Sequence, residues 1–484
     1  MFEELASALQ AGGGATTGEM SISMLGMLNK ALQSTSGITS PSDPSGLSGG
    51  AALRVQSLEQ TLLSTIQENS HFKLFNLMPK PKAIATVDEW TEQRGVGGYL
   101  GGSTNGEVDP VADATGDYTR RVGMVKFLMT KRQISLVTAT QGSITDAEAT
   151  EYQNGALQLL TDAEYLSFSG DSSVVPSEFD GLLAQLSGYN GGSQVIDAKG
   201  ADVSDITWIN QAVQRVVGYG NWGTSTNILC SPQVQASFDN NLDPAFRVSL
   251  TQNTGPTLLG TTVEAVRSMG LVIKFDYDTF LLDETQRILP QILSPAYVNA
   301  ALAPTVSAVV NSSGGASSAW ASAHAGTYYY WVVGLTNKGF SAGVQSSQMT
   351  VAAGNSVSLT ITPSVGNAET GYAIFRGKRN GPNALSDARL MKRIPKAASG
   401  NTVYVDLNTD IPGATEMYVL NLTKGAKALD WRQFLPMIKF NLAATNAPVI
   451  PWLQIMMGYL RVGKRGHHVV IKNIIPANAV WKPF

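Results

Sequence analysis

A long helical pattern that ends abruptly in a glycine-containing turn restricts the fold of this chain more than any other feature. Thr145-Asp146-Ala147-Glu148 has the spacing of a capping box, in which the Thr and Glu side chains accept hydrogen bonds from free backbone N–H groups at a helix start. The apolar pattern then continues to about Phe168, which corresponds to a helix of about 35 Å. Gly170-Asp171-Ser172 breaks the pattern, and after a Pro-centred loop a new packed segment begins at Phe179-Asp180-Gly181-Leu182. The sequence therefore predicts a long helix joined by a tight turn to a second packed segment.

The composition is that of a folded protein with much covered surface. The chain has 484 residues, which is long for one ordinary domain, and 43% of them are hydrophobic while 15% are charged. Low charge with this apolar content argues against disorder and for surface that is hidden, for example by copies of the same chain. The formal net charge of −3 gives no general attraction to nucleic acid or to anionic lipid.

The single cysteine and the first residues indicate a cytoplasm-like compartment. Cys230 cannot form a disulfide framework within the chain, and its apolar surroundings favour a buried small side chain over a nucleophile. Met1 is followed by acidic Glu3 and Glu4, so we expect no secretory signal. No run approaches the roughly 18 apolar residues of a membrane span. We therefore expect no membrane association.

Two segments in the first quarter of the chain lack the apolar residues for a core of their own. Residues 1–50 are low in charge and rich in small residues, which predicts an extended arm, and helical spacing follows from Leu53. Residues 88–117 place a glycine-rich tip between strand-like sides. This pattern predicts a long two-stranded excursion that buries little apolar surface in a monomer. Such an excursion is favoured if it packs on a neighbouring copy. Arg94 is its one cation, against Asp88, Glu89, Glu92, Glu107, Asp109, Asp113 and Asp117.

The pattern of apolar residues changes twice after the long helix. Residues 204–217 have helical spacing, an apolar strand follows at 227–231, and Ser231-Pro232 has the N-cap and first-turn proline of another helix. This order indicates a mixed α/β domain. From about Ala303 to Tyr418, short alternating strands between turn signals predict a β-sandwich, whose TYYYWVVGLTNKGFS segment resembles fibronectin type III or immunoglobulin-like modules. Strand patterns then resume, so the sandwich is predicted to be an insertion.

The candidate chemical motifs favour structural interpretations. Gly170-Asp171-Ser172 is the nucleophile block of one class of serine hydrolases, but the histidines lack that class's spacing, so we expect a turn in which Asp171 caps backbone groups. His467 and His468 would point to opposite faces of a strand, which predicts an ordinary surface strand and no metal site. Alternation splits Tyr328-Tyr329-Tyr330-Trp331 between two faces, which favours core packing over a sugar-stacking platform. We predict no catalytic residue, no metal and no cofactor.

The charge map has two open interpretations. Residues 421–484 contain nine Lys or Arg and one acid, Asp430. This segment is either a solvated basic face with a general attraction for DNA, or the partner of the acidic 88–117 excursion of another copy. Opposite-signed patches on one chain steer self-association and fix its register. The candidate inter-subunit residues are Glu89, Glu92 and Asp109 on the acidic side and Arg461, Lys464 and Arg465 on the basic side.

The order of these parts resembles the major capsid proteins of tailed bacteriophages with the Hong Kong 97-like fold, an α+β class. The strongest local match is GDSS…PSEFDGLL, after the long helix. The resemblance covers most of residues 51–300 and 420–484. The resemblance divides the chain into an N-terminal arm at 1–85, a first part of the shell domain at 86–300, an inserted immunoglobulin-like β-sandwich at 301–418 and a closing part of the shell domain at 419–484. Within the first part of the shell domain, it implies an extended loop at 88–130, a spine helix of the peripheral domain at 141–168 and an axial domain at 180–300.

The resemblance implies a structural protein of the virion. Such a chain would form pentamers and hexamers of an icosahedral shell, assemble in the host cytoplasm and enclose double-stranded DNA without sequence specificity. Its partners would be other copies, a portal and decoration proteins. Residues 88–125 contain no Lys, so the isopeptide crosslink of some relatives is not expected. The alternatives are a cell-surface or carbohydrate-binding structural protein with an immunoglobulin-like module, and a hydrolase built on Ser172.

Overall fold

The computed structural model describes residues 71–111, 113–140, 146–241, 263–281, 298–299, 302–312, 314, 317–444 and 447–484. All of these belong to the unit Thr65–Phe484. The predicted arm at 1–85 therefore lies mostly outside the described residues, as does the helix expected from Leu53. Its last part contains the short helix α3, Lys73–Leu77.

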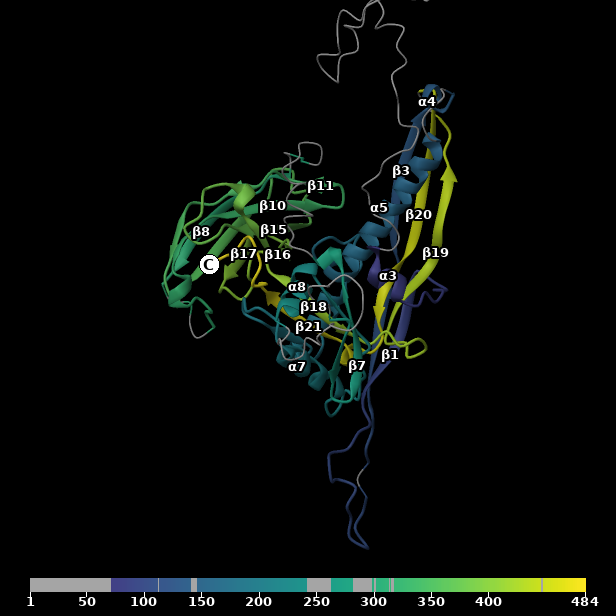
Figure 1. Ribbon diagram of the computed structural model, residues 1–484, viewed down its shortest axis with the longest axis vertical. Coiled ribbons are helices and arrows are strands. Elements are labelled where there is room, and N and C mark those ends of the chain that lie inside the picture. Colours follow the sequence, from purple (N-terminus) through teal and green to yellow (C-terminus); the bar gives the residue numbers. More distant parts are fainter. Residues whose placement is uncertain are drawn as a thin grey trace, which may run out of the picture. The chain divides into compact units, whose positions relative to one another are not determined.

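The long helix packs along an antiparallel sheet. Helix α5 spans Ala147–Ser169, and the sheet has the order β19-β20-β3, with strands Leu429–Asn441, Val449–Val462 and Lys126–Ser135. Figure 1 shows α5 beside β3 and β20. Gly155 permits the close approach, because a Cβ there would lie 1.7 Å from Oε1 of Gln454. The predicted helix is confirmed, but its N-cap is Asp146, whose side chain accepts from the backbone N–H groups of Glu148 and Ala149. Thr145, the predicted cap, lies outside the described residues.

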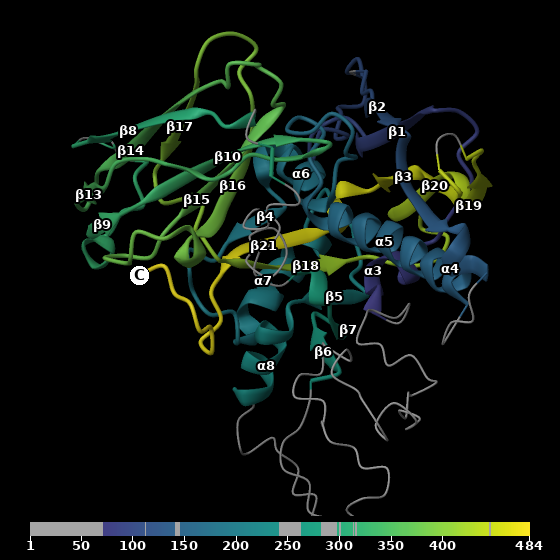
Figure 2. The same ribbon diagram turned by 90° about the horizontal axis from the view of Figure 1, so that it is seen from above.

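A mixed sheet in the order β4-β21-β18-β5-β7-β6 has apolar side chains on both faces. In β18, Met417 and Val419 join one apolar cluster while Tyr418 and Leu420 join another, as strand alternation dictates. Apolar residues of α7 and α8 belong to the first cluster, and apolar residues of α5 and α6 belong to the second. Figure 2 shows where these helices lie around the sheet. The bounds are β4 Val195–Asp197, β5 Asn227–Cys230, β6 Ala265–Ser268, β7 Leu271–Tyr277, β18 Thr415–Leu420, β21 Val469–Ile474, α4 Leu136–Thr140, α6 Leu182–Ser187, α7 Ile206–Val217 and α8 Pro232–Asn240.

The predicted helix–strand–helix order of this part is confirmed. Ser231 caps α8 by accepting from the backbone N–H of Val234, with Pro232 in the first turn. Cys230 is fully buried, and burial raises the pKa of its thiol, as expected for a packing residue.

The short strands predicted between 303 and 418 are also present. One sheet joins β8, β14 and β17, a second joins β10, β11, β12, β15 and β16, and β9 pairs with β13. The first two sheets share an apolar cluster that includes Tyr330, Tyr372 and Leu359. The bounds are β8 Thr305–Asn311, β9 Gly326–Tyr328, β10 Tyr330–Thr336, β11 Gly339–Phe340, β12 Val344–Gln345, β13 Met349–Val351, β14 Ser356–Thr362, β15 Gly371–Arg376, β16 Arg389–Pro395 and β17 Thr402–Asp406.

The turn at 364–369 is closed at its base by a single carboxylate. Glu369 accepts from the backbone N–H of Ser364 at 2.8 Å, from its hydroxyl at 2.5 Å and from the Tyr372 hydroxyl at 3.1 Å. Val365 at the tip is exposed, and a Cβ on Gly366 would meet no atom within 4 Å.

Both faces of the aromatic run are buried. Tyr328 and Tyr330 lie in the cluster between the sheets, as predicted for one face. The other face is also covered, because Trp331 belongs to a second apolar cluster, which includes Val174 and Val175 of the turn after α5. The expectation of a single core face was incomplete, since it could not include this long-range contact.

The turn after α5 therefore joins the two parts of the chain. Arg393 on β16 donates to both carboxylate oxygens of Glu178, at 2.8 and 2.7 Å, and to the carbonyl of Ser169 at 3.2 Å. Asp171 caps the turn as predicted, accepting from the backbone N–H of Ser173 at 2.9 Å. Gly170 is required, because a Cβ there would lie 2.3 Å from the carbonyl oxygen of Phe179.

The last residues of the chain also lie on these strands. The backbone N–H of Arg379 donates to the carbonyl of Pro483, and the Phe484 ring stacks on His324 with centroids 3.8 Å apart. The closing segment predicted at 419–484 thus contains the end of β18, strands β19 to β21 and then a tail that packs against the strands of 305–406. Most of β18 precedes residue 419, so four residues of this mixed-sheet strand fall within the range predicted for the sandwich.

A buried ion pair lies within the same strands. Arg376 and Asp406 are fully buried and 2.6 Å apart, and Tyr330 donates to the same Asp406 oxygen at 2.8 Å. We expect Arg376→Met to destabilise the dissociated chain by about 3–5 kcal/mol, because it leaves a buried carboxylate without its cation. The matched control is Lys392→Met, which removes a partly exposed pair with Asp410 and should change stability by about 1 kcal/mol or less. Urea unfolding followed by tryptophan fluorescence measures both, and equal losses would contradict the expectation.

Glu164 on α5 gives the chain a pH-dependent stability. Its carboxylate is buried and accepts from the backbone N–H groups of Leu74 and Phe75 at 2.7 and 2.8 Å. Burial, followed by the charge of Asp278, raises the pKa of Glu164 well above 4.5.

The native state therefore binds more protons than the unfolded state between the ordinary and the raised pKa of Glu164, and stability falls as pH rises through that window. We expect Glu164→Gln to remove a slope of up to about 1.4 kcal/mol per pH unit above pH 4.5. Unfolding midpoints across pH 4–8 measure this slope. Glu151→Gln, which alters a partly exposed pair with Arg132, is the control and should leave the slope unchanged.

Candidate functional site

The acidic excursion is a hairpin whose loop has no core. Strands β1, Val87–Gly95, and β2, Asp117–Met124, pair antiparallel from Val87↔Met124 to Gly95↔Asp117, and residues 96–116 continue beyond the last pair (Figure 1). The predicted two-stranded excursion is confirmed, although β3 belongs to the sheet beside α5. The large apolar side chains of the loop are between 75% and 93% exposed: Val96, Tyr99, Leu100, Val108 and Val111.

The loop carries one sign of charge. Residues 96–116 contain Glu107, Asp109 and Asp113 and no Lys, Arg or His. Asp109 is exposed and accepts from the backbone N–H of Gly106 at 3.1 Å. The loop thus presents acidic and apolar side chains together to its surroundings.

We call the part of the hairpin formed by β1 and β2, as opposed to its loop at 96–116, the hairpin base. Its first anchor is Asp88 on β1. It accepts from Arg432 at 2.7 and 3.2 Å and from the Tyr459 hydroxyl at 2.7 Å. Burial opposes ionisation, but the hydrogen bonds from Arg432 and Tyr459 and the nearby guanidinium charges hold the pKa of Asp88 below its ordinary value. Gly123 on β2 permits this contact, because a Cβ there would lie 2.2 Å from the Tyr459 ring.

The second anchor is Glu92, which is only 8% exposed. It accepts from Arg465 at 2.7 Å, and the Nε atoms of Arg121 and Arg94 lie 3.6 and 3.8 Å from the same oxygen. We call Arg94, Arg121 and Arg465 the arginine cluster. Burial and then the charge of Arg465 lower the pKa of Arg121. The buried Nε atoms of Arg94 and Arg121 make no hydrogen bond within the part of the chain that the structure describes.

The structure brings the oppositely charged segments together inside one chain. Glu92 pairs with Arg465, and Arg461 pairs with Asp430 at 2.9 and 2.5 Å. These residues, expected to meet across copies, thus have partners within the chain. The other candidates are exposed. Glu89 pairs with Arg120 at 3.1 Å on the hairpin, Asp109 lies in the loop, and Lys464 precedes Arg465.

Sequence reasoning missed several members of this site. Asp88 and Arg432 were counted only as parts of charged segments, and Arg121 lies just beyond the acidic range. An alternation argument could have found one of them. Asp88 and Glu92 are four residues apart on a strand and so share one face, where both need cations.

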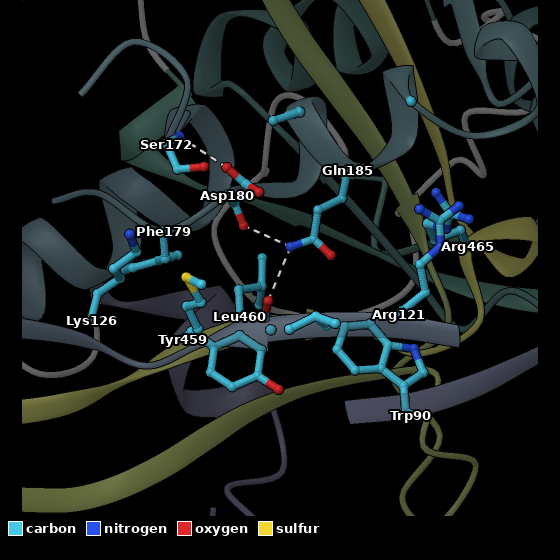
Figure 3. A pocket seen from close by; sticks show the side chains of 15 residues that line it. Trp90, Arg121, Lys126, Ser172, Phe179, Asp180, Gln185, Tyr459, Leu460 and Arg465 are labelled. Atoms are coloured by element: carbon cyan, nitrogen blue, oxygen red, sulfur yellow. Dashed lines mark hydrogen bonds between the residues drawn. The ribbon is translucent and has the colours of Figure 1, made fainter. Parts of the chain in front are cut away.

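A cavity of about 400 Å³ lies beside the arginine cluster. Trp90, Phe179 and Tyr459 contribute aromatic walls, while Arg121, Lys126 and Arg465 contribute positive charge and Asp180 contributes one negative charge. Figure 3 shows Gln185 between Asp180 and Leu460, and its Nε2 donates to their carbonyls at 2.6 and 3.0 Å. The site can therefore accept an apolar group together with a carboxylate.

The other candidate motifs have structural roles. His468 is fully buried, so the expected surface strand is wrong for this residue. Its Nδ1 accepts from the backbone N–H of Asn421 at 3.3 Å, and burial lowers the pKa of His468 to about 4. The backbone N–H of Ser172 donates to Asp180 at 2.9 Å, within the turn after α5. Among the described helices, none is both long and apolar enough to cross a bilayer.

Glu92 makes a testable contribution to the hairpin. We expect Glu92→Gln to weaken the docking of β1 by about 1.5–3 kcal/mol, because hydrogen bonds to buried charges have this magnitude. Hydrogen exchange of the β1 and β2 amides should accelerate accordingly. Glu89→Gln, which alters an exposed pair, is the control and should change exchange little. Equal acceleration in the two variants would contradict the anchoring role.

Comparison with known proteins gives a relative that aligns with most of the chain at low sequence identity. No family model matches the chain. The chain is 26% identical over 423 residues to a putative major capsid protein of Enterococcus phage phiEF24C, which covers 84% of this chain and 86% of the relative.

The comparison with solved structures gives low similarity scores, as two capsids illustrate. The capsid of the native GTA particle gives a TM-score of 0.47 at 9% identity and covers 91% of this chain and 100% of that chain. The capsid of Myoviridae phage XM1 gives 0.43 at 7% identity and covers 86% and 96%. Over most of its length, the chain is thus similar in sequence to a putative phage major capsid protein.

Proposed function

We propose that this chain is the major capsid protein of a tailed bacteriophage, a structural and non-enzymatic component of the virion. The sequence relative supports this, because the similarity extends over 84% of the chain and is not confined to one module. The proposal includes the Hong Kong 97-like fold, with α5 as the spine helix and β18 with its neighbours as the axial sheet.

The observation that carries the proposal is the uncovered loop of the hairpin. Its five large apolar side chains are at least 75% exposed, although a soluble monomer rarely exposes contiguous apolar surface. A two-stranded hairpin is at best marginally stable alone, and here only its base is anchored. Neighbouring copies would cover the loop, so that many modest contacts close a shell.

In this proposal the parts have distinct tasks. Residues 1–85 form the arm, the hairpin within 88–130 is the extended loop, and 180–300 form the axial domain. The closing part at 419–484 completes the peripheral domain through β19 and β20 and the axial domain through β21. Pentamers and hexamers assemble in the host cytoplasm and enclose double-stranded DNA without sequence specificity. A portal and decoration proteins are further partners. Glu89, Asp109 and Lys464 are the exposed candidates for contacts between copies.

We also propose that residues 301–418 are an inserted immunoglobulin-like β-sandwich on the outer side of the shell. Two facing sheets with a shared apolar cluster support it. The module is not loosely tethered, because Val174, Val175 and Glu178 of the turn after α5 pack or pair with it. It is thus a fixed part of the subunit.

The alternative is a cell-surface or carbohydrate-binding structural protein. A sugar platform needs exposed aromatic rings, whereas Tyr328, Tyr330 and Trp331 are buried. No observation on the described residues favours this alternative.

Electron microscopy of the purified chain tests the proposal. We expect closed particles or discrete rings from the unmodified chain, and their loss in a Tyr99→Ser, Leu100→Ser, Val108→Ser variant that remains folded, because the covered apolar surface is removed. The matched control is Val365→Ser, Val403→Ser, Val405→Ser, which removes three exposed apolar groups from a turn and a strand outside the hairpin. A monomer at all concentrations from the unmodified chain would overturn the proposal.

A further inference from the structure

We propose that the arginine cluster and the adjacent cavity at the hairpin base are the receptor for the hairpin loop of a second copy. A loop carboxylate from Glu107, Asp109 or Asp113 pairs with Arg94 and Arg121, and a loop apolar side chain enters the cavity. This inference rests on the proposed assembly and specifies which two surfaces of the chain meet.

The charges of the two surfaces are complementary. The arginine cluster with Glu92 has a net charge of +2 over the four named side chains, while the loop at 96–116 carries three acids and no cation. Like charges held together in a partly buried site repel one another, and a further carboxylate relieves this. Opposite patches of this kind select the partner and fix its register.

The hydrogen-bonding capacity of the cluster is incomplete. Nε of Arg94 and Nε of Arg121 are buried, and within the described chain neither makes a hydrogen bond. Both side chains contact Glu92 only at 3.8 and 3.6 Å and are 29% and 35% exposed, so their outer N–H groups can donate to a carboxylate from another copy. Guanidinium groups match carboxylates in geometry, which favours an acidic side chain over a neutral one.

The cavity matches the apolar part of the loop. Its aromatic walls, Trp90, Phe179 and Tyr459, lie within the same 400 Å³ space as Arg121 and Arg465 (Figure 3). Tyr99 and Leu100 on the loop are both more than 80% exposed. A single docked loop could therefore bury an apolar side chain and lower the net positive charge of the cluster at once.

The loop of the same chain is directed away from this site. The hairpin ladder ends at Gly95↔Asp117, whereas Trp90 pairs with Arg121 well inside it. The loop leaves the ladder at the end opposite to its connection with β3. Because the loop and the receptor are different patches, the contact is head-to-tail, and repetition of such a contact closes a ring when the rotation between successive copies adds up to a full turn.

Disulfide trapping between two single-cysteine additions tests the inference. Cys230 is fully buried, so each added cysteine is the accessible thiol of its chain. One chain carries Asp109→Cys, and the other carries Val122→Cys at the cavity rim, where Val122 is exposed. The two purified chains are co-assembled and oxidised. We expect mixed dimers on non-reducing gels only when both variants are present, and a several-fold lower yield when the Val122→Cys chain also carries Arg121→Gln.

The controls separate this inference from the proposed function. A Val403→Cys chain replaces Val122→Cys and should give few mixed dimers, since Val403 lies on β17. Normal particles without mixed dimers, or with equal trapping at Val403, would overturn the inference and leave the capsid proposal intact. Trapping that is unaffected by Arg121→Gln would overturn the role of the arginine cluster. Absence of particles from the unmodified chains would overturn both proposals together.

Discussion

Two carboxylates on one face of β1 hold a hairpin that could not fold alone. Asp88 and Glu92 reach Arg432 and Arg465, which follow them by more than 340 residues in the chain. An exposed ion pair contributes little, but these side chains are largely buried and hydrogen-bonded, so loss of one partner is costly. The anchored base lets the loop remain uncovered and available while the subunit itself stays folded.

The elements that sequence reasoning predicted are those determined by local chemistry. Helix α8 begins where Ser231 and Pro232 place it, and short strands occupy residues 305–406 as predicted, although β10 and β15 are buried on both faces. The N-cap of α5 differs by one residue, because Asp and Thr in adjacent positions both suit a cap and the backbone decides between them. Trp331 is buried in a cluster that also contains Val174, and no local sequence pattern links the two residues.

The sequence indicates pairing of the acidic and basic segments as one of two interpretations, but it does not predict that they pair within one chain. The acidic and basic segments do meet, yet Glu92 and Arg465 meet inside one subunit. Charge counts cannot distinguish the same chain from a neighbouring one, since that depends on how β1 lies on β20. The sequence also does not show that Arg94 and Arg121 both lie beside the Glu92 carboxylate, because this arrangement depends on the fold.

The turn closed by Glu369 has a practical consequence. The carboxylate ties Ser364 to Tyr372 below the tip, so the ends of the turn are fixed independently of what joins them. Loop tips of this kind tolerate added residues because no buried backbone group is disturbed. If the chain assembles as proposed, a foreign peptide placed between Val365 and Gly366 would be displayed by every subunit of the particle, at a density set by the lattice of the shell.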